Sequence, residues 1–186
     1  DLQDYRYWRQ QDGDLNLVTV HTQMATLRVF MKWAASYDAV PEGMHAKVRV
    51  PDLPRDADVN DDMIEAEAAF DILEYLKMYE YASKRHVMFS ILWFTGMRMG
   101  AVRGIDLGDI ERDKRGAYID LKHRPEQDTP LKNKAQGERP VAIHDKRYEL
   151  IQDYIKARRE DHTDEYGREP LLTTVYGRVG KGTFRQ

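Results

Sequence analysis

The sequence contains no cysteine, and its six histidines form no close pair with acids at metal-ligand spacing. Disulfide bonds, thiolate metal sites and thiol chemistry are therefore excluded. We expect no metal ion and no cofactor. The absence of cysteine also favours an intracellular location, where thiols are kept reduced and disulfides are rare.

Long apolar runs are absent as well. The longest extends from Val87 to Phe94, with Ser90 inside it, and is far shorter than the ~20 residues needed to cross a bilayer. The chain opens at Asp1 without an initiator Met, a basic n-region or an apolar h-region, so no signal peptide is visible. We expect no membrane span and interpret the chain as a piece excised from a longer protein.

Neither sign of charge dominates, since the net charge is −3. The charges are unevenly distributed, however: residues 112–147 hold ten Lys and Arg against six Asp and Glu, a local net charge of +4. DNA binding depends on local charge on one face, so the overall balance does not exclude it. Aspartate outnumbers glutamate by 20 to 12 and arginine outnumbers lysine by 18 to 11, a composition that fits a salt-adapted source such as a haloarchaeon.

The first third is predicted to be helical. A short helix over Leu2–Gln11 is followed by a turn at 12–14 and a helix of roughly Val20–Tyr37, capped by Thr19. Its predicted apolar stripe consists of Met24, Leu27, Met31 and Ala34, widened by Phe30, Trp33 and Tyr37. Its polar side carries His21, Gln23, Arg28 and Lys32. These types suit contacts with phosphates and base edges, and a solvated helix face explains them equally well.

The stretch from Pro41 to Asp62 has three prolines, an acidic run and little helical period, which is typical of a linker. We therefore predict a domain over residues 1–54, a linker over 55–61 and a second domain over 62–186. The second domain is expected to begin with a helix capped near 60–62. The predicted apolar line of that helix is Ala68, Ile72, Leu76 and Tyr79.

Further along, Ser83 is predicted to cap a largely buried helix over Lys84–Phe94, which Thr95 and Gly96 interrupt. Short strands are then predicted at Ala117–Leu121, Thr129–Leu131 and Pro140–Ile143, followed by a helix over Lys146–Arg159. The glycine-containing tail from Tyr166 is expected to be poorly anchored. The pattern predicts a mainly α fold with a small antiparallel β-sheet.

Residues 94–110 read Phe-Thr-Gly-Met-Arg-Met-Gly-Ala-Val-Arg-Gly-Ile-Asp-Leu-Gly-Asp-Ile. With the apolar helix before them, they resemble the T-G-x-R box of tyrosine recombinases of the phage-integrase type. Gly96 allows a sharp turn, which would place Arg98 at the start of a new helix facing the DNA cleft. The resemblance makes Arg98 a catalytic residue that grips the scissile phosphate, since a guanidinium can bind two non-bridging oxygens at once.

Residues 131–143 read Leu-Lys-Asn-Lys-Ala-Gln-Gly-Glu-Arg-Pro-Val-Ala-Ile. They resemble the family's β-hairpin, whose lysine is the general acid that protonates the departing 5′ oxygen. Lys132 is the first choice for this role. Lys134 is the alternative because it stands nearer to Arg139 in the sequence. The alternative without a catalytic role is that Lys132 and Lys134 are simply two exposed lysines at the tip of a hairpin.

The sequence departs from the family pattern in two ways. Many relatives have a glutamate three residues after the arginine, where this chain has Ala101. Asp109 is a candidate for the orienting role of that carboxylate, although capping or turn formation after Gly108 is equally open. The family's H-x-x-R box, later His or Trp and nucleophilic Tyr are not found by Gln186, so we expect them to follow it.

The resemblance implies a helical SAM-like core-binding domain followed by a truncated α+β tyrosine-recombinase catalytic domain. It implies double-stranded DNA as partner, self-association on DNA in the full-length protein, and a cytoplasmic, nucleoid-associated location. Candidate DNA-binding residues are Arg28, Lys32, Arg103, Lys134 and Arg139. The family breaks and rejoins DNA through a 3′-phosphotyrosyl link without metal or nucleotide, and the 186-residue chain itself is expected to be inactive.

Two alternatives belong to other functional classes. The chain is equally consistent with a non-catalytic DNA-binding module or a truncated regulator that occupies recombination sites without cutting. A helical protein-interaction domain that uses the Tyr- and Met-rich surface is less favoured, and it predicts no salt-sensitive affinity for DNA.

Overall fold

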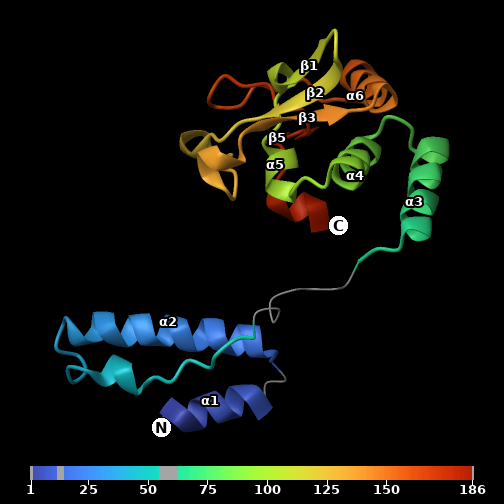
Figure 1. The fold of residues 1–186 in the computed structure, drawn as a ribbon. Coiled ribbons are helices and arrows are strands. Elements are labelled where there is room, and N and C mark those ends of the chain that lie inside the picture. Colours follow the sequence, from blue (N-terminus) through green and yellow to red (C-terminus); the bar gives the residue numbers. More distant parts are fainter. Residues whose placement is uncertain (1, 12–14, 55–62, 186) are drawn as a thin grey trace. The chain divides into compact units, whose positions relative to one another are not determined.

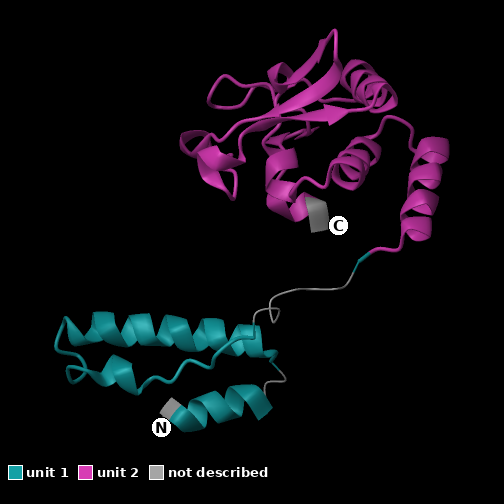
Figure 2. Cartoon of the chain, in the orientation of Figure 1, with its two compact units in different colours: residues 1–63 teal, residues 64–186 magenta. Residues whose placement is uncertain are grey.

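A computed structural model describes residues 2–11, 15–54 and 63–185. The chain divides into two compact units, residues 1–63 and residues 64–186 (Figure 2). The turn predicted at 12–14, the linker predicted at 55–61 and the helix cap predicted at 60–62 lie outside the described residues.

Unit 1 is helical, with α1 over Leu2–Gln11, α2 over Leu17–Ala35 and a 3-10 turn, η1, over Met44–Lys47 (Figure 1). The predicted first helix is confirmed. The predicted cap of the second helix is wrong: Asn16, not Thr19, caps α2, and its side chain accepts a hydrogen bond from the backbone N–H of Thr19 at 2.8 Å. Asparagine is among the best N-cap residues, so the helix begins three residues earlier than expected.

The core of unit 1 is small. Val20 and Met24 of α2 pack against Val48, supported by Leu15, Leu27, Met31 and Val50. The expectation that three aromatic residues widen this stripe is wrong, because Phe30, Trp33 and Tyr37 are 53%, 56% and 71% exposed. Within its described residues, unit 1 offers a short helix and one 3-10 turn to cover α2. These elements bury a narrow apolar stripe and leave the neighbouring aromatic one uncovered.

Unit 2 combines four helices with a three-stranded antiparallel sheet (Figure 1). The helices are α3 (Ala66–Tyr79), α4 (Lys84–Thr95), α5 (Met99–Arg103) and α6 (Asp145–Ala157). The strands are β1 (Ile110–Asp113), β2 (Gly116–Leu121) and β3 (Arg139–Ile143), in the order β1-β2-β3. Ile119 of β2 lies opposite Ile110 and Val141. The predicted mainly α fold with a small antiparallel sheet is confirmed.

One of the three predicted strands is wrong. Residues 129–131 form no strand, and Thr129 makes only an isolated bridge with Arg124. Pro130 has no N–H to donate to a ladder, and the long β2–β3 connection is occupied by the 3-10 turns η3 (Pro125–Gln127) and η4 (Lys134–Gly137). The third strand is β1, which pairs with β2 directly after the T-G-x-R segment.

The buried face of α3 is also not the predicted one. Ala69, Leu73 and Leu76 are buried, whereas Ile72 and Tyr79 are 37% and 68% exposed. The helix carries apolar residues in two stripes one residue out of phase, and packing against α4 selects one of them. By contrast, α4 forms as expected: Ser83 caps it by accepting from the backbone N–H of His86 at 3.1 Å.

The chain after α6 is firmly anchored, contrary to prediction. It forms the short strands β4 (Thr173–Thr174) and β5 (Gly177–Arg178) and a final 3-10 turn, η5 (Lys181–Arg185). Leu171, Leu172 and Val179 are at most 1% exposed and belong to the main core of unit 2, with Val87, Ile91 and Ile119. Apolar residues that show no helix or strand period in the sequence are therefore buried by tertiary packing.

No described helix is both long and apolar enough to cross a membrane. Within 2–11, 15–54 and 63–185, no three His, Cys, Asp or Glu side chains gather closely enough to hold a metal ion.

Candidate functional site

The T-G-x-R segment forms a sharp corner between α4 and α5. Gly96 ends α4 in the left-handed region, with φ of 61° and ψ of 18°, a conformation that costs glycine little. Thr95 Oγ1 donates to the carbonyl of Ile91 at 2.5 Å and accepts from the backbone N–H of Met97 at 3.3 Å. Met97 is buried. This corner places Arg98 immediately before α5, as its N-cap residue, as the sequence predicted.

An open cavity of about 560 Å³ lies beside this corner. Three basic residues line it: Arg98 from the corner, Lys132 from the β2–β3 connection, and Arg139 from the start of β3. The remaining lining residues are Gly96, Met97, Gly100, Ala101, Leu121, Pro130, Leu131, Asn133 and Gly137. No acidic residue is among them, so this basic cavity is an electrostatically favourable place for an anion.

The basic side chains of the cavity are largely unengaged. Neither Arg98 nor Lys132 makes a side-chain hydrogen bond or ion pair with any part of the chain that the structure describes. Arg139 donates from Nη1 to the carbonyl of Gly137 at 3.1 Å, which leaves its other guanidinium nitrogens available. The donors of the cavity are therefore free to meet a ligand from outside.

Lys132 is held in place by its neighbours. Leu131 is buried, and its backbone N–H donates to Nδ1 of His123 at 2.9 Å. Lys134 has a positive φ of 53° and does not line the basic cavity. Of the two lysines considered from the sequence, only Lys132 thus lies around the same cavity as Arg98.

Two of the arginines expected to bind DNA are used internally. Arg103 donates to the carbonyls of Val179 and Asp128 at 3.0 and 2.7 Å and to Oδ2 of Asp128 at 2.8 Å. In unit 1, Arg28 donates from Nε and Nη2 to the carbonyl of Val48 at 3.1 and 2.7 Å. Lys32 is exposed near the end of α2. Arg28 and Arg103 therefore stabilise their own units, which their types alone did not reveal.

The polar side of α2 is similarly engaged. His21 Nδ1 lies 2.7 Å from the carbonyl of Pro51, and Gln23 Oε1 accepts from Nε of Arg9 at 2.9 Å. Of the four polar α2 residues that the sequence indicated as DNA contacts, Lys32 is the one without such an internal contact among the described residues.

Asp109 is not among the residues that line the basic cavity. Its carboxylate accepts two hydrogen bonds from Arg124, at 2.9 and 2.6 Å, and one from the backbone N–H of Asp106 at 3.0 Å, which completes a capping box around η2 (Leu107–Asp109). Burial alone would raise the pKa of Asp109, but the hydrogen bonds from Arg124 and Asp106 outweigh it and lower that pKa. The capping role considered from the sequence is the one observed.

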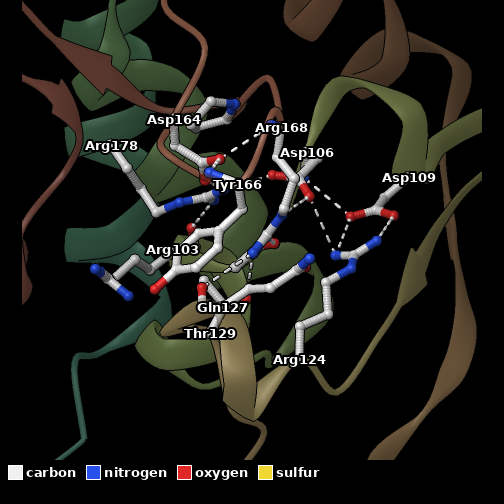
Figure 3. A network of polar contacts seen from close by, with 12 residues as sticks. Arg103, Asp106, Asp109, Arg124, Gln127, Thr129, Asp164, Tyr166, Arg168 and Arg178 are labelled. Carbon is white, nitrogen blue, oxygen red and sulfur yellow. Dashed lines mark hydrogen bonds and ion pairs between the residues drawn. The ribbon is translucent and has the colours of Figure 1, made fainter.

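A network around Asp106 was not foreseen from the sequence (Figure 3). Asp106 is 7% exposed, and its carboxylate meets Arg124 at 3.2 Å, Arg168 at 2.7 Å and Arg178 at 2.7 Å. Arg178 also pairs with Asp164 at 2.9 Å. Asp106 lies 62 and 72 residues from Arg168 and Arg178, so no local pattern could have indicated this Asp106 network.

The Asp106 network attaches the last part of the chain to the segment after the T-G-x-R corner. Arg178 Nη1 donates to the carbonyl of Arg103 at 2.9 Å, and Arg168 Nη2 to that of Gly104 at 3.3 Å. The backbone N–H of Leu171 donates to the carbonyl of Ile105 at 2.9 Å. The end of α5 is thereby fixed to the core, which supports the position of Arg98 at its other end.

No family model and no curated protein matches the chain, whereas solved structures do. The Tn1549 transposon integrase in complex with circular intermediate DNA is 18% identical, with a TM-score of 0.62 over 100% of this chain and 62% of that one. The same integrase with transposon right end DNA matches with 18% identity and a TM-score of 0.58, over 95% and 58%. XerA recombinase matches with 14% identity and a TM-score of 0.50, over 99% and 56%.

The chain spans about three-fifths of the length of these structures. The match extends over both units, whereas the motifs that carried the sequence resemblance lie at residues 94–110 and 131–143, both in unit 2. At this level of identity the likeness concerns the fold. The chain has the fold of the tyrosine recombinases and integrases.

Proposed function

We propose that this chain is a DNA-binding part of a site-specific tyrosine recombinase or integrase, and that the basic cavity binds a backbone phosphate. The observation that carries the proposal is the gathering of Arg98, Lys132 and Arg139 around one cavity without an acid, in a chain whose net charge is −3. Such a gathering of cations without a neighbouring acid attracts an anion.

Within this proposal each residue has a distinct role. Arg98 binds two non-bridging oxygens of the scissile phosphate through its planar fork and offsets the charge that develops there. Lys132, on its long flexible stem, protonates the departing 5′ oxygen. Its place around the cavity supports it over Lys134. Arg139 adds a further contact to the DNA backbone. The attacking tyrosine belongs to the proposed full-length protein.

Unit 1 is proposed to be the core-binding domain that clamps DNA, and residues 64–186 the first part of the catalytic domain. The free side chain of Lys32 supports a phosphate contact from α2. Self-association of the full-length protein on DNA is part of the same proposal. A non-catalytic module would use the same cavity and differ only in lacking cleavage in its full-length form.

Exposed aromatic residues of α2 and of the turn that follows it favour one competing function, a protein-interaction domain. Phe30, Trp33 and Tyr37 form a ladder with ring centroids 5.7 and 5.0 Å apart, and each is more than half exposed. Exposed apolar patches of this kind mark interaction surfaces. A chain with this function alone would not bind DNA in a salt-sensitive way.

The test is duplex DNA binding across a salt series, measured by fluorescence anisotropy. We expect affinity to fall steeply with salt, and the triple variant Arg98→Ala, Lys132→Ala, Arg139→Ala to lose most binding and to reduce the salt slope by about three, roughly one for each phosphate contact removed. The matched control replaces three exposed basic residues elsewhere in unit 2, Lys114, Lys156 and Arg158, by Ala. Equal effects of the two triple variants, or no binding by the wild-type chain at low salt, would overturn the proposal.

A further inference from the structure

A second cavity, of about 390 Å³, lies between α4, β3 and the start of α6. Its lining residues are Ser90, Ile91, Phe94, Thr95, Ala142, Ile143, His144, Lys146 and Arg147. No acid is among these described residues, and two are cationic. Phe94 and Thr95 line the second cavity, while Gly96, Met97 and Arg98 line the basic cavity. The two cavities therefore lie at consecutive residues of the same corner.

Arg147 is the distinctive residue of the second cavity. Its guanidinium carbon lies 3.7 Å from the centroid of the Phe94 ring, so the planar group is held against the aromatic face. Its Nε is buried and has no hydrogen-bond partner within the described chain. Burial lowers the pKa of Arg147, and no carboxylate of the described residues pairs with it.

Several other arginines of unit 2 have the carboxylate partner that Arg147 lacks. Arg124, Arg168 and Arg178 each donate to at least one carboxylate at 2.9 Å or less. Arg112 offers a closer comparison, because it also lies over an aromatic ring, with its guanidinium carbon 5.4 Å from the centroid of Tyr148. Arg112 nevertheless pairs with Asp145 at 3.0 Å. A buried donor without an acceptor is costly in a folded protein. A ligand that offers an acceptor atom to Nε of Arg147 would remove this cost.

We propose that Arg147, with Lys146, binds a second phosphate of the DNA backbone whose first phosphate occupies the basic cavity. This inference rests on the proposed function. Lys146 is exposed and unpaired among the described residues. The apolar walls from Ile91, Phe94 and Ile143 reduce competition from water and strengthen the bond between guanidinium and phosphate, and the aromatic ring fixes the plane of the fork.

The spacing of the two cavities suits one DNA backbone. Phe94 and Arg98 are four residues apart, so their Cα atoms are separated by at most about 15 Å. One strand of duplex DNA carries a phosphate about every 3.4 Å along the helix axis. The two cavities are therefore neighbours along the corner, and one DNA strand carries phosphates closely enough spaced to occupy both. Two anchored phosphates, rather than one, would fix the direction of the strand across the corner.

The experiment compares wild-type chain with Arg147→Met, which keeps an apolar stem over Phe94 and removes the charge. We expect this variant to bind duplex DNA more weakly and with a salt slope smaller by about one. Arg147→Lys should restore the slope and part of the affinity, since a lysine contacts phosphate as a point charge. The matched control is Arg112→Met, which removes the same group over a ring but leaves affinity and slope nearly unchanged.

A second measurement uses the unmodified chain, in case Arg147→Met fails to fold. The NMR signal of the Arg147 Nε–H group, assigned by its absence in Arg147→Lys, should shift on addition of duplex DNA. Inorganic phosphate serves as the second probe. A shift with phosphate and none with DNA would overturn the inference, because the cavity would then take a free anion.

The outcomes separate this inference from the proposed function. If DNA binding depends on Arg98 and Lys132 but Arg147→Met changes neither affinity nor slope, the second phosphate site is wrong and the proposed function stands. If the wild-type chain does not bind DNA at low salt, both are wrong. If Arg147→Met weakens DNA binding and lowers the salt slope while Arg112→Met changes neither, the second phosphate site is supported.

Discussion

Arg178 donates from Nη2 to Oδ1 of Asp106 at 2.7 Å, across 72 residues of sequence. Both side chains are nearly buried, with 7% and 10% of their side-chain surface exposed. Asp106 follows the helix that Arg98 precedes, and Arg178 belongs to β5. This pair therefore joins the end of the described chain to the segment that carries the candidate phosphate site.

Replacing Asp106 should destabilise unit 2 strongly. Asp106→Asn leaves three guanidinium groups with a weaker acceptor, and breaking a buried ion pair on one side costs about 3–5 kcal/mol. Urea unfolding followed by circular dichroism would measure the loss. Asp128→Asn is the control, because its side chain is 67% exposed where it pairs with Arg103 and such pairs contribute about 0–1 kcal/mol. Similar losses for the two variants would contradict a special role for Asp106.

Stability should fall in acid partly through Asp109. Its pKa is lower in the folded chain than its ordinary value of 3.8, since the hydrogen bonds from Arg124 outweigh the opposing effect of burial. The stabilisation is therefore complete above the ordinary value and is lost as the pH falls through the folded value. Urea unfolding at pH 7, 4.5 and 3 should show wild type and Asp109→Asn converging toward low pH. Asp161→Asn, at an exposed side chain, is the control. It should leave the pH dependence of the free energy of unfolding the same as in the wild type.

The chain after α6 should contribute to the core as strongly as any helix. Leu171 is fully buried, and truncating a buried leucine costs about 2–5 kcal/mol. Leu171→Ala should therefore lower the free energy of unfolding of the whole of unit 2 in one cooperative transition. Tyr176, which is 94% exposed on the adjoining turn, provides the control, and Tyr176→Ala should have little effect. An unchanged midpoint for Leu171→Ala would show that this segment is not part of the core.

The chemistry proposed for Arg98 and Lys132 can be separated in a version of the protein extended through the expected nucleophile. The 186-residue chain should form no covalent adduct with a nicked suicide substrate, and the extended protein should form one. Arg98→Ala should abolish adduct formation and Lys132→Ala should slow it. A substrate with a 5′-bridging sulfur, which needs no proton, should rescue Lys132→Ala and not Arg98→Ala. Rescue of Lys134→Ala alone would identify the other lysine as the acid.

Local sequence signals predicted the elements that depend on local physics. Ser83 specified the start of α4 through its cap, and Gly96 specified the corner through its left-handed backbone. The T-G-x-R resemblance indicated Arg98 and the hairpin resemblance indicated Lys132, and both residues line one cavity in the structure. Their catalytic roles stay predictions. These signals act over a few residues, where a cap or a turn has one favourable solution.

Features decided by tertiary packing were not predictable in the same way. The buried face of α3 depends on α4, and the aromatic ladder of Phe30, Trp33 and Tyr37 is exposed because the described elements of unit 1 do not cover it. Arg28 and Arg103 have the right chemistry for DNA, but backbone carbonyls from distant segments use their donors. The partners of Asp106 lie so far along the chain that only the folded structure reveals them.

The Asp106 network has a consequence for how related sequences can diverge. Asp106 meets guanidinium groups contributed by positions 124, 168 and 178, and Arg124 and Arg178 also pair with Asp109 and Asp164. A neutral residue at 106 would therefore leave the buried Arg168 without a carboxylate and weaken the pairing of the other two arginines. Evolution can lose this arrangement only by changing several positions together. Homologues should therefore show coordinated replacement at 106, 168 and 178, in which the acid and both arginines are kept as a set or exchanged as a set for apolar residues.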